Sequence, residues 1–446
     1  MRRLVRSSAH ALMRTRSFPN DDRSCGWIAM LPPLPPPRRL PSGQHADCVV
    51  LGAGFTGLAA ARQLATHRPD WRVALIEAQR VGFGASGRNS GFIVDVGHYE
   101  PKRGVDGNRR LVRLGRAGLD RLRTLVRTHA IECAWTERGR LHAAVGDLGM
   151  RRLDEFYGGL RAMGEAHETL DAAAVTAITG TSYYRAAART RGAVMVQPAA
   201  LARGLAATLP PNVELFEESP VRAIHRGTTF RLEAGQGAIT ADRLFLTANG
   251  FTSSLGFLRR RVFPLWTFAS LSRVLTDEEQ TTLAGEPEWG LVPEERMGTT
   301  VRRTRDSRIL IRNTVRYTAG ADITEASRHQ LREIHERSFR ARFPMLPRVA
   351  LEYTWGGVLG MSVNGAQFFG KIADHVFAAA GCNGVGIALG TIAGALLADL
   401  AVGADSELLR DILSLPQPGW IPPDPFLGLA VRATLAQLQA RARDEL

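Results

Sequence analysis

The stretch LGAGFTGLAAARQLA, residues 51–65, decides the fold of this chain. Its Gly52-Ala53-Gly54-Phe55-Thr56-Gly57 turn follows an apolar strand predicted over 47–51 and opens a helix predicted over 55–67. In such a turn the first glycine permits the tight bend, the second admits a pyrophosphate, and the third lets helix and strand pack closely. The helix N-terminus attracts the phosphate charge. A second strand over 72–77 ends on Glu77, where a carboxylate can bind ribose hydroxyls, so the pattern predicts a dinucleotide-binding βαβ unit.

A second glycine- and serine-rich stretch, GFGASGRNSGF over 82–92, favours a flavin over a nicotinamide dinucleotide. A nicotinamide enzyme needs no such stretch. In a flavoenzyme the chain has to run along the pyrophosphate and ribityl groups to reach the isoalloxazine ring. The alternative interpretation is an ordinary flexible loop, since glycine and serine commonly punctuate connections.

Residues 82–91 closely resemble the flavin loop of the FAD-dependent D-amino-acid oxidase/glycine oxidase superfamily, and most of all its gamma-glutamylputrescine oxidoreductase-like branch. The resemblance runs from about Pro32 to the C-terminus and is strongest over 47–92 and 354–402. It implies an α/β fold: a discontinuous glutathione-reductase-like FAD-binding Rossmann domain with an inserted substrate domain of antiparallel β-sheet plus helices. The expected division is 1–45, a disordered basic and Pro-rich segment; 46–135, 190–258 and 365–420, the FAD-binding domain; 136–189 and 259–364, the substrate domain; and 421–446, a helical tail.

The resemblance also implies which residues contact FAD. Ser219-Pro220-Val221 is similar to a strand that contacts adenine, residues 246–250 to a second turn near the nucleotide, and residues 355–357 and 381–386 to segments that flank the flavin ring. A helix predicted from Val385 to about Leu400 would stabilise the negative charge of reduced flavin with its N-terminus. The predicted cofactor-binding residues are Gly52, Gly54, Phe55, Thr56, Gly57, Glu77, Ala78, Gly84, Ala85, Ser86, Gly87, Arg88, Asn89, Ser90, Val221, Ala248, Asn249, Gly250, Gly357, Gly381, Asn383, Gly384, Val385 and Gly386.

The sequence departs from the family pattern at several positions. Val385 stands where many members have a histidine, and Ala388 stands where sarcosine-oxidase-like relatives have a lysine for the substrate carboxylate. The flavin-linking cysteine and histidine of other relatives have no counterpart near 360–361 or 88–89. We therefore expect noncovalent FAD, and a plain α-amino acid as substrate only if an arginine binds its carboxylate.

Four arginines on two adjacent predicted strands could supply that group: Arg302, Arg303, Arg308 and Arg312. Arginine binds carboxylates in a bidentate manner, although most exposed arginines form only surface ion pairs. We expect Arg302 or Arg312 to contact the substrate, with Trp266 and Trp355 among the aromatic residues of the pocket. No catalytic acid or base follows from the sequence, because His98 and His375 stand in no diagnostic pattern.

The predicted reaction is oxidation of the C–N bond of an amine or amino acid by hydride transfer to flavin N5, after which the imine is hydrolysed. Oxygen or a quinone would accept the electrons. Two alternatives stay open: a flavin-dependent tRNA-modifying oxidase, whose RNA binding would depend strongly on salt, and a flavin-binding protein without turnover.

Charge and cysteine content restrict partners and location. The net charge is +14, but residues 1–40 alone contain eight arginines against two aspartates, and the other positive charges are thinly spread. Nucleic acid is therefore not expected as a partner. The four cysteines form no CxxC pair and no metal-ligand spacing, which predicts a reduced, cytoplasmic protein without a metal site. Residues 376–398 lack charge, but glycines interrupt them, so we expect a strand, a turn and a buried helix in place of a transmembrane segment.

Overall fold

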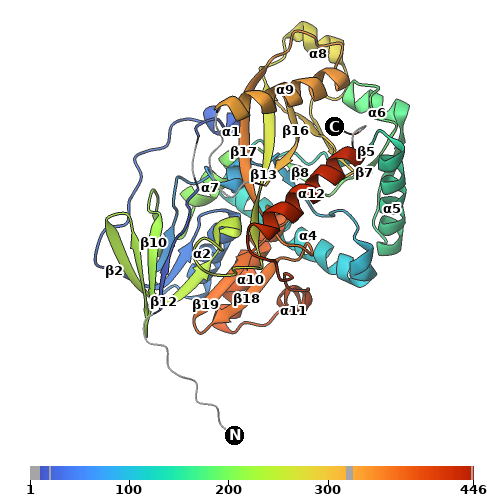
Figure 1. Ribbon diagram of the computed structural model, residues 1–446. Coiled ribbons are helices and arrows are strands. Elements are labelled where there is room, and N and C mark those ends of the chain that lie inside the picture. Colours follow the sequence, from blue (N-terminus) through green and yellow to red (C-terminus); the bar gives the residue numbers. More distant parts are fainter. Residues whose placement is uncertain (1–10, 20–21, 318–324, 443–444, 446) are drawn as a thin grey trace.

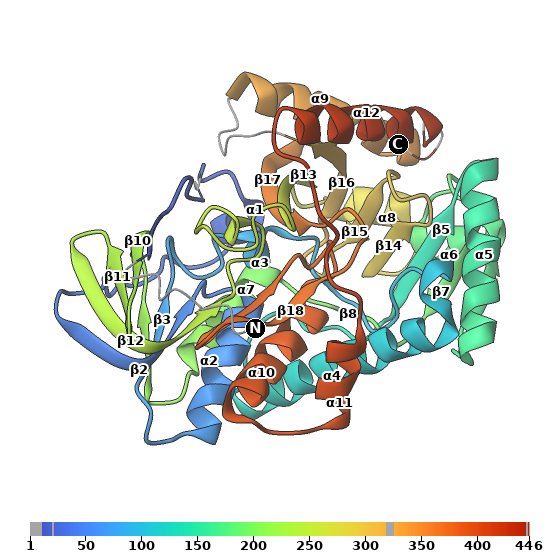
Figure 2. The same ribbon diagram turned by 60° about the horizontal axis from the view of Figure 1, so that its bottom comes forward.

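The computed structural model describes residues 11–19, 22–317, 325–442 and 445, and its strands form two large sheets that lie side by side (Figure 1; Figure 2). The first sheet has nine strands in the order β1-β10-β11-β12-β2-β3-β9, with β19 paired to β12 and β18 paired to β19. Its strands are β1 (Ala11–Arg14), β2 (Gln44–Leu51), β3 (Val73–Ile76), β9 (Val213–Phe216), β10 (Val221–Arg226), β11 (Phe230–Ala234), β12 (Gly237–Leu246), β18 (Phe368–Ala373) and β19 (Val376–Ala380).

The central strands of this sheet are parallel, and their carboxyl ends meet at one edge. In the register of β12, β2 and β3, Leu246 lies opposite Leu51, and Leu51 lies opposite Ile76. The helix α2 (Phe55–His67) follows β2 directly, so β2-α2-β3 is the predicted βαβ unit. Ligands of open parallel sheets bind at this edge, and the predicted dinucleotide turn lies here.

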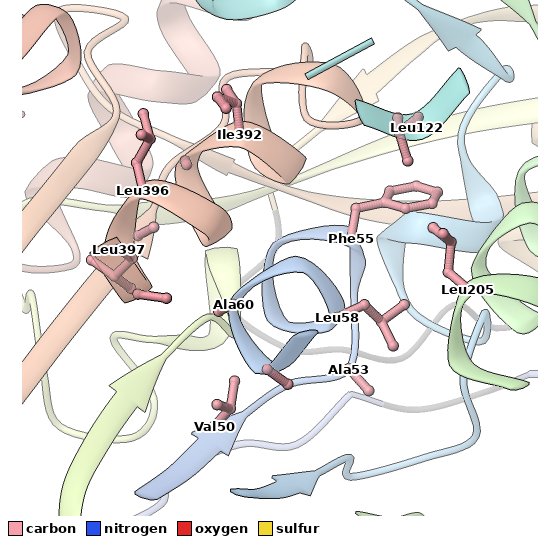
Figure 3. Close-up of a cluster of buried hydrophobic side chains, with 14 of the residues drawn as sticks. Val50, Ala53, Phe55, Leu58, Ala60, Leu122, Leu205, Ile392, Leu396 and Leu397 are labelled. Carbon is pink, nitrogen blue, oxygen red and sulfur yellow. The ribbon is translucent and has the colours of Figure 1, made fainter. Parts of the chain in front are cut away.

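Helices bury one face of the first sheet. Val50 of β2 and Leu58 of α2 pack with Leu122, Leu205 and Ile392 from three other helices (Figure 3). The alternate residues of β2, Val49 and Leu51, belong to a second core with β10, β11 and β12. The helices on this side are α4 (Gly104–Thr128), α7 (Pro198–Ala207), α10 (Ala388–Val402) and α11 (Glu407–Ser414).

The second sheet has eight strands in the order β17-β13-β16-β15-β14-β5-β7-β6. The sheet is antiparallel, as expected, except at one pair, since β14 and β5 run parallel. β5 ends at Ala144 and β14 begins at Trp289, so no hairpin turn joins the two strands and forces them to run antiparallel. The strands are β5 (Arg140–Ala144), β6 (Glu168–Asp171), β7 (Ala186–Thr190), β13 (Phe263–Ser272), β14 (Trp289–Pro293), β15 (Thr300–Arg303), β16 (Ile309–Arg316) and β17 (Leu351–Met361).

One face of the second sheet is apolar and covered by helices. Val175, Leu283 and Phe339, from three helices, pack with Leu141 and Ile311 of the sheet. Two other helices also belong to this half. α5 (Asp147–Met163) packs on β5 and β7, and α12 (Phe426–Arg441) contacts β16. The covering helices are α6 (Ala172–Thr179), α8 (Asp277–Leu283) and α9 (Glu325–Arg342).

The strands divide between the two sheets by segment. Every strand named above within 136–190 and 259–364 lies in the second sheet, and those within 44–76, 213–258 and 365–420 lie in the first. A short pair, β4 (Phe92–Ile93) with β8 (Val194–Met195), stands apart from both sheets. The exact domain boundaries remain a prediction.

The expectation that residues 1–45 are disordered is wrong for much of the described part. β1 pairs antiparallel with β10, and the short helix α1 (Gly26–Ala29) is anchored by Trp27, which is only 2% exposed. A composition rich in arginine and proline hid the apolar run CGWIAM at 25–30. Residues 1–10 lie outside the described residues.

Among the described residues, no single helix is long and apolar enough to cross a membrane. Only α10 and α11 taken together pass the length and composition criteria, and they are bent by 104°. Residues 376–398 form β19, a turn and the mostly buried α10.

We predict that Gly394→Ala destabilises the protein by at least about 2 kcal/mol, because overpacking a tight contact forces the backbone to shift. A Cβ at Gly394 of α10 would lie 2.0 Å from the carbonyl oxygen of Thr56 in α2. Gly158→Ala in α5 is the matched control: its Cβ would have no heavy atom within 4 Å, and alanine favours helix by about 1 kcal/mol. Urea unfolding of both variants tests this, and equal midpoints would contradict it.

Candidate cofactor and substrate site

A single cavity of about 1200 Å³ joins the carboxyl edge of the first sheet to the open face of the second. Residues of the Gly-rich turn, such as Gly52, line it together with residues of β13 and β16, such as Thr267 and Arg312. The two Gly-rich stretches identified in the sequence both border this one cavity.

The turn at Gly52 has the geometry that its glycines predict. Gly52 has φ +99°, a conformation that favours glycine. A Cβ at Gly57 would lie 1.8 Å from the carbonyl oxygen of Gly52, so this position has no room for a side chain. The Glu77 carboxylate accepts hydrogen bonds from the backbone N–H groups of Ala53 (2.8 Å) and Gln79 (3.0 Å). Burial raises the pKa of Glu77, against these two bonds, and Glu77 lines the cavity.

The second stretch is held against the first and is no free loop. The hydroxyl of Ser86 accepts a hydrogen bond of 3.1 Å from the backbone N–H of Phe55, at the start of α2. A short helix, α3 (Ala85–Arg88), follows, and the amide of Asn89 donates to the carbonyl oxygens of Ala85 and Ser86. The chain from 84 to 90 therefore runs along the cavity wall in a fixed conformation.

Arg88 is the buried centre of the contacts that hold this stretch. Its guanidinium pairs with Asp22 at 3.1 Å and donates to the carbonyl oxygen of Gly356 in β17 at 2.9 Å. The indole N–H of Trp355 donates to the carbonyl oxygen of Arg88 at 3.0 Å. Arg88 was predicted as a cofactor residue; it lines the cavity and also connects β17 of the second sheet to the N-terminal segment.

The N-terminal segment 22–31 straps this loop from outside. The indole N–H of Trp27 donates to the carbonyl oxygen of Asn89 at 2.8 Å, and the side chain of Gln197 donates to the carbonyl oxygen of Trp27 at 2.6 Å. The Trp27 ring packs edge-on to Trp355 with centroids 6.2 Å apart. Sequence reasoning missed this strap, although its signal was the apolar run CGWIAM at 25–30 with Trp27 within it.

The predicted ring-flanking turn is organised by Asn249. Its carbonyl oxygen accepts hydrogen bonds from the backbone N–H groups of Gly381 (3.0 Å) and Cys382 (3.1 Å). The helix expected to begin at Val385 begins at Ala388, because residues 383–386 form a turn in which Asn383 and Gly384 have positive φ. The residues of this turn line the cavity, although the N–H groups of Asn383 and Val385 already donate to backbone carbonyl oxygens.

Most predicted cofactor residues line the cavity, and three do not. Gly57, Gly87 and Gly381 lie behind it; the first two support it, since a Cβ at Gly57 or Gly87 would meet the carbonyl oxygen of the residue five positions earlier within 2 Å. The groups present fit an extended flavin dinucleotide: glycine backbone and a helix N-terminus for pyrophosphate, a carboxylate for ribose, and a second small-residue turn for the ring. The predicted residues that line the cavity are Gly52, Gly54, Phe55, Thr56, Glu77, Ala78, Gly84, Ala85, Ser86, Arg88, Asn89, Ser90, Val221, Ala248, Asn249, Gly250, Gly357, Asn383, Gly384, Val385 and Gly386.

The prediction of Arg302 as a substrate residue is wrong. Its guanidinium is 1% exposed and donates to the carbonyl oxygen of Val196 at 2.6 Å, with Glu288 at 3.6 Å. Trp266 and Trp355 do not line the cavity either. Trp266 packs with Phe268 and the helix residue Leu331, and Trp355 supports the strap.

Arg312 is the predicted substrate residue that does line the cavity. Its Nε donates to the hydroxyl of Thr267 at 3.0 Å. It forms no salt bridge with a carboxylate of any described residue, and burial alone lowers its pKa, which for a guanidinium leaves the charge in place. The terminal nitrogens of Arg312 are therefore available to an anion within the cavity. His98 also lines the cavity, whereas His375 does not.

We predict that Trp27→Ala weakens FAD binding about tenfold, because the loop 84–90 loses a hydrogen bond and its packing support. Fluorescence titration of the apoprotein with FAD measures the Kd. Trp420→Ala is the control, since Trp420 is 57% exposed and does not line the cavity. An unchanged Kd in the Trp27 variant would show that the strap does not position the loop.

Known proteins resemble this chain in sequence and in fold. The probable oxidoreductase OrdL of Haemophilus influenzae is 25% identical over 385 residues, covering 82% of this chain and 85% of that protein. Gamma-glutamylputrescine oxidoreductase of Escherichia coli is 28% identical over 386 residues, covering 83% and 86%. The crystal structure of glycine oxidase from Geobacillus kaustophilus shares the fold, with a TM-score of 0.68 and 21% identity over 82% of this chain and 96% of that one. The family model described as FAD dependent oxidoreductase (DAO) matches residues 47–400, and the chain belongs to that family.

Proposed function

We propose that this FAD-dependent oxidoreductase oxidises the C–N bond of an amine that also carries a carboxylate. The observation that supports this substrate class is Arg312, a half-buried cation at the cavity wall with no salt bridge to any described carboxylate. Burying a lone charge is costly unless a partner joins it, and a substrate carboxylate would be that partner. The names of the relatives, gamma-glutamylputrescine oxidoreductase, glycine oxidase and iminodiacetate oxidase, refer to amines or amino acids.

The cofactor residues proposed from the sequence would hold FAD noncovalently, because no cysteine or histidine stands at 88–89 or 360–361. Gly52, Gly54 and the start of α2 would receive the pyrophosphate, and Glu77 the ribose. When bound, FAD accepts a hydride at N5 from the carbon next to the substrate nitrogen, and the imine released is hydrolysed by water.

The chain's own contribution is orientation in a dry site. Arg312 would fix the carboxylate, and Leu265, Phe268 and Val315 supply an apolar wall around it. A low-polarity cavity strengthens the Arg–carboxylate interaction and favours a neutral amine over an ammonium group. The backbone of residues 384–386 would stabilise negative charge that develops at the flavin ring.

The remaining expectations belong to this proposal. Electrons would pass on to oxygen or a quinone, and we propose a cytoplasmic location, in keeping with four cysteines in no paired or metal-ligand pattern. A salt-sensitive RNA complex would instead favour a tRNA-modifying oxidase.

We predict that Arg312→Gln raises the KM for a carboxylate-bearing amine about a hundredfold, because a charge-assisted, bidentate contact is lost. FAD content should stay unchanged, since the cofactor residues are intact. The assay is anaerobic bleaching of the flavin with a panel that includes sarcosine, glycine, D- and L-amino acids, putrescine and gamma-glutamylputrescine. Arg152→Gln on the exposed side of α5 is the control. A panel in which only amines lacking a carboxylate bleach the flavin would contradict the proposal.

A further inference from the structure

The cavity extends across the second sheet, well beyond Arg312. It is lined by Gly357 on β17, Thr267 on β13, Arg312 on β16, Thr300 on β15 and Pro293 on β14, which are successive strands of the sheet. Adjacent strands lie about 4.8 Å apart. The cavity wall at β14 is therefore about 10 Å from Arg312, on the side away from the predicted flavin-ring residue Gly357.

A chain of buried polar groups ends at this far wall. Arg140 of β5 donates to His142 Nε2 at 2.8 Å, and His142 Nδ1 is 2.5 Å from the carboxylate of Glu294, which follows β14. The same carboxylate lies 3.3 Å from Nδ1 of His98. His98 lines the cavity, and 37% of its side chain is exposed, unlike the buried Arg140, His142 and Glu294.

The protonation pattern of this chain is fixed by Arg140. A guanidinium can only donate, so His142 Nε2 accepts, and His142 Nδ1 must carry the proton that it donates to Glu294. Burial, together with the charge of Arg140, lowers the pKa of His142 to about 3, so this imidazole is neutral. Burial opposes ionisation of Glu294, but His98 and the hydrogen bond from His142 hold the pKa of Glu294 below its usual value. The ionised carboxylate accepts from His98 Nδ1–H. An imidazolium at His98 would then donate its Nε2–H to an anion in the cavity, whereas a neutral imidazole would offer only a lone pair there.

The ligand atoms of His98, His142 and Glu294 lie within 4.8 Å of one another, as they would around a metal ion. A metal would bind His142 at Nδ1, where the hydrogen bond from Arg140 requires a proton. Arg140 therefore disfavours a metal at this cluster and favours its use as a support for His98.

Charged side chains close to His98 in the sequence also line the cavity: the acidic Asp95 and Glu100 and the basic Lys102 and Arg103. Arg296 lines it as well. Arg296 pairs with Glu100 at 2.9 Å, whereas Lys102 and Arg103 form no salt bridge with any described residue. Lys102 is exposed, and Arg103 donates to the carbonyl oxygen of Gly365 at 3.3 Å. Two cations without a carboxylate salt bridge among the described residues, beside a protonated imidazole, would attract an anion.

We propose that His98, with Lys102 and Arg103 beside it, forms a second anion subsite, and that the substrate carries a second carboxylate about 10 Å from the one at Arg312. This rests on the proposed function and adds the length and charge of the substrate. Glu294 is a positioning residue here, since it touches His98 and not the substrate.

The test is a titration of the FAD-loaded enzyme with substrate-like inhibitors, followed by the flavin absorbance. Straight-chain dicarboxylates of five to ten carbon atoms are compared with monocarboxylates of equal length. We expect a dicarboxylate of matching span to bind about tenfold more tightly than its monocarboxylate, from one added charge-assisted hydrogen bond. His98→Ala should abolish this advantage and leave the monocarboxylate Kd unchanged. His329→Ala, an exposed histidine on α9, should retain it.

Each other outcome overturns a defined part of the proposal. Monocarboxylates that bind through Arg312 with no gain at any dicarboxylate length overturn the second subsite alone. A tenfold gain that survives His98→Ala overturns the role of His98. A gain lost after dialysis against EDTA assigns the cluster to a metal ion and overturns the imidazole subsite. If no carboxylate perturbs the flavin, the Arg312 site and the subsite built upon it both fail.

Discussion

The close approach of α2 to its neighbours is the constraint on which the site depends. Gly57 brings α2 so near the turn at Gly52 that a Cβ would overlap a carbonyl oxygen, and Gly394 brings α10 equally near the backbone of Thr56. Packing at this distance directs the N-terminus of α2 at the cavity, where its free N–H groups can meet a phosphate. The carboxylate of Glu77 then fixes the turn itself through the N–H of Ala53.

Arg88 holds the loop of residues 84–90 in position. It is a buried charge that contacts the strap at Asp22, β17 at Gly356 and the cavity, so the flavin loop cannot move without breaking an ion pair in a poorly solvated place. The strap therefore makes the N-terminal segment part of the site, although residues 22–31 precede the part of the chain that the family model matches. The loop of residues 84–90 is ordered by tertiary contacts that the strap makes on its outer side.

The second sheet gives the cavity a direction. Its strands place Arg312 near the flavin side and Glu294 two strands further on, with His98 held above it. Arg312 and His98 are both polar groups at the cavity wall. A ligand that bonds to them would offset the free-energy cost of removing them from water. The polar groups from Arg140 to His98 bond mainly to one another, and Arg140 and His98 also line the cavity.

The sequence by itself determined the βαβ turn, α2 with both of its ends and β19, and most of the cofactor residues predicted from it line the cavity. These are local features, because glycine positions, helix periodicity and a short apolar strand report directly on backbone conformation. Tertiary structure decided between Arg302 and Arg312, which are equivalent in chemistry. Arg302 donates to the carbonyl oxygen of Val196 and lies 3.6 Å from Glu288. Arg312 lines the cavity and forms no salt bridge with any carboxylate of the described residues. It also assembled Trp27 with Asn89 and His98 with His142 and Glu294, since residues far apart in the chain leave no joint pattern in the sequence. Side-chain partners depend on which strands become neighbours, and that is set by the packing of the whole chain.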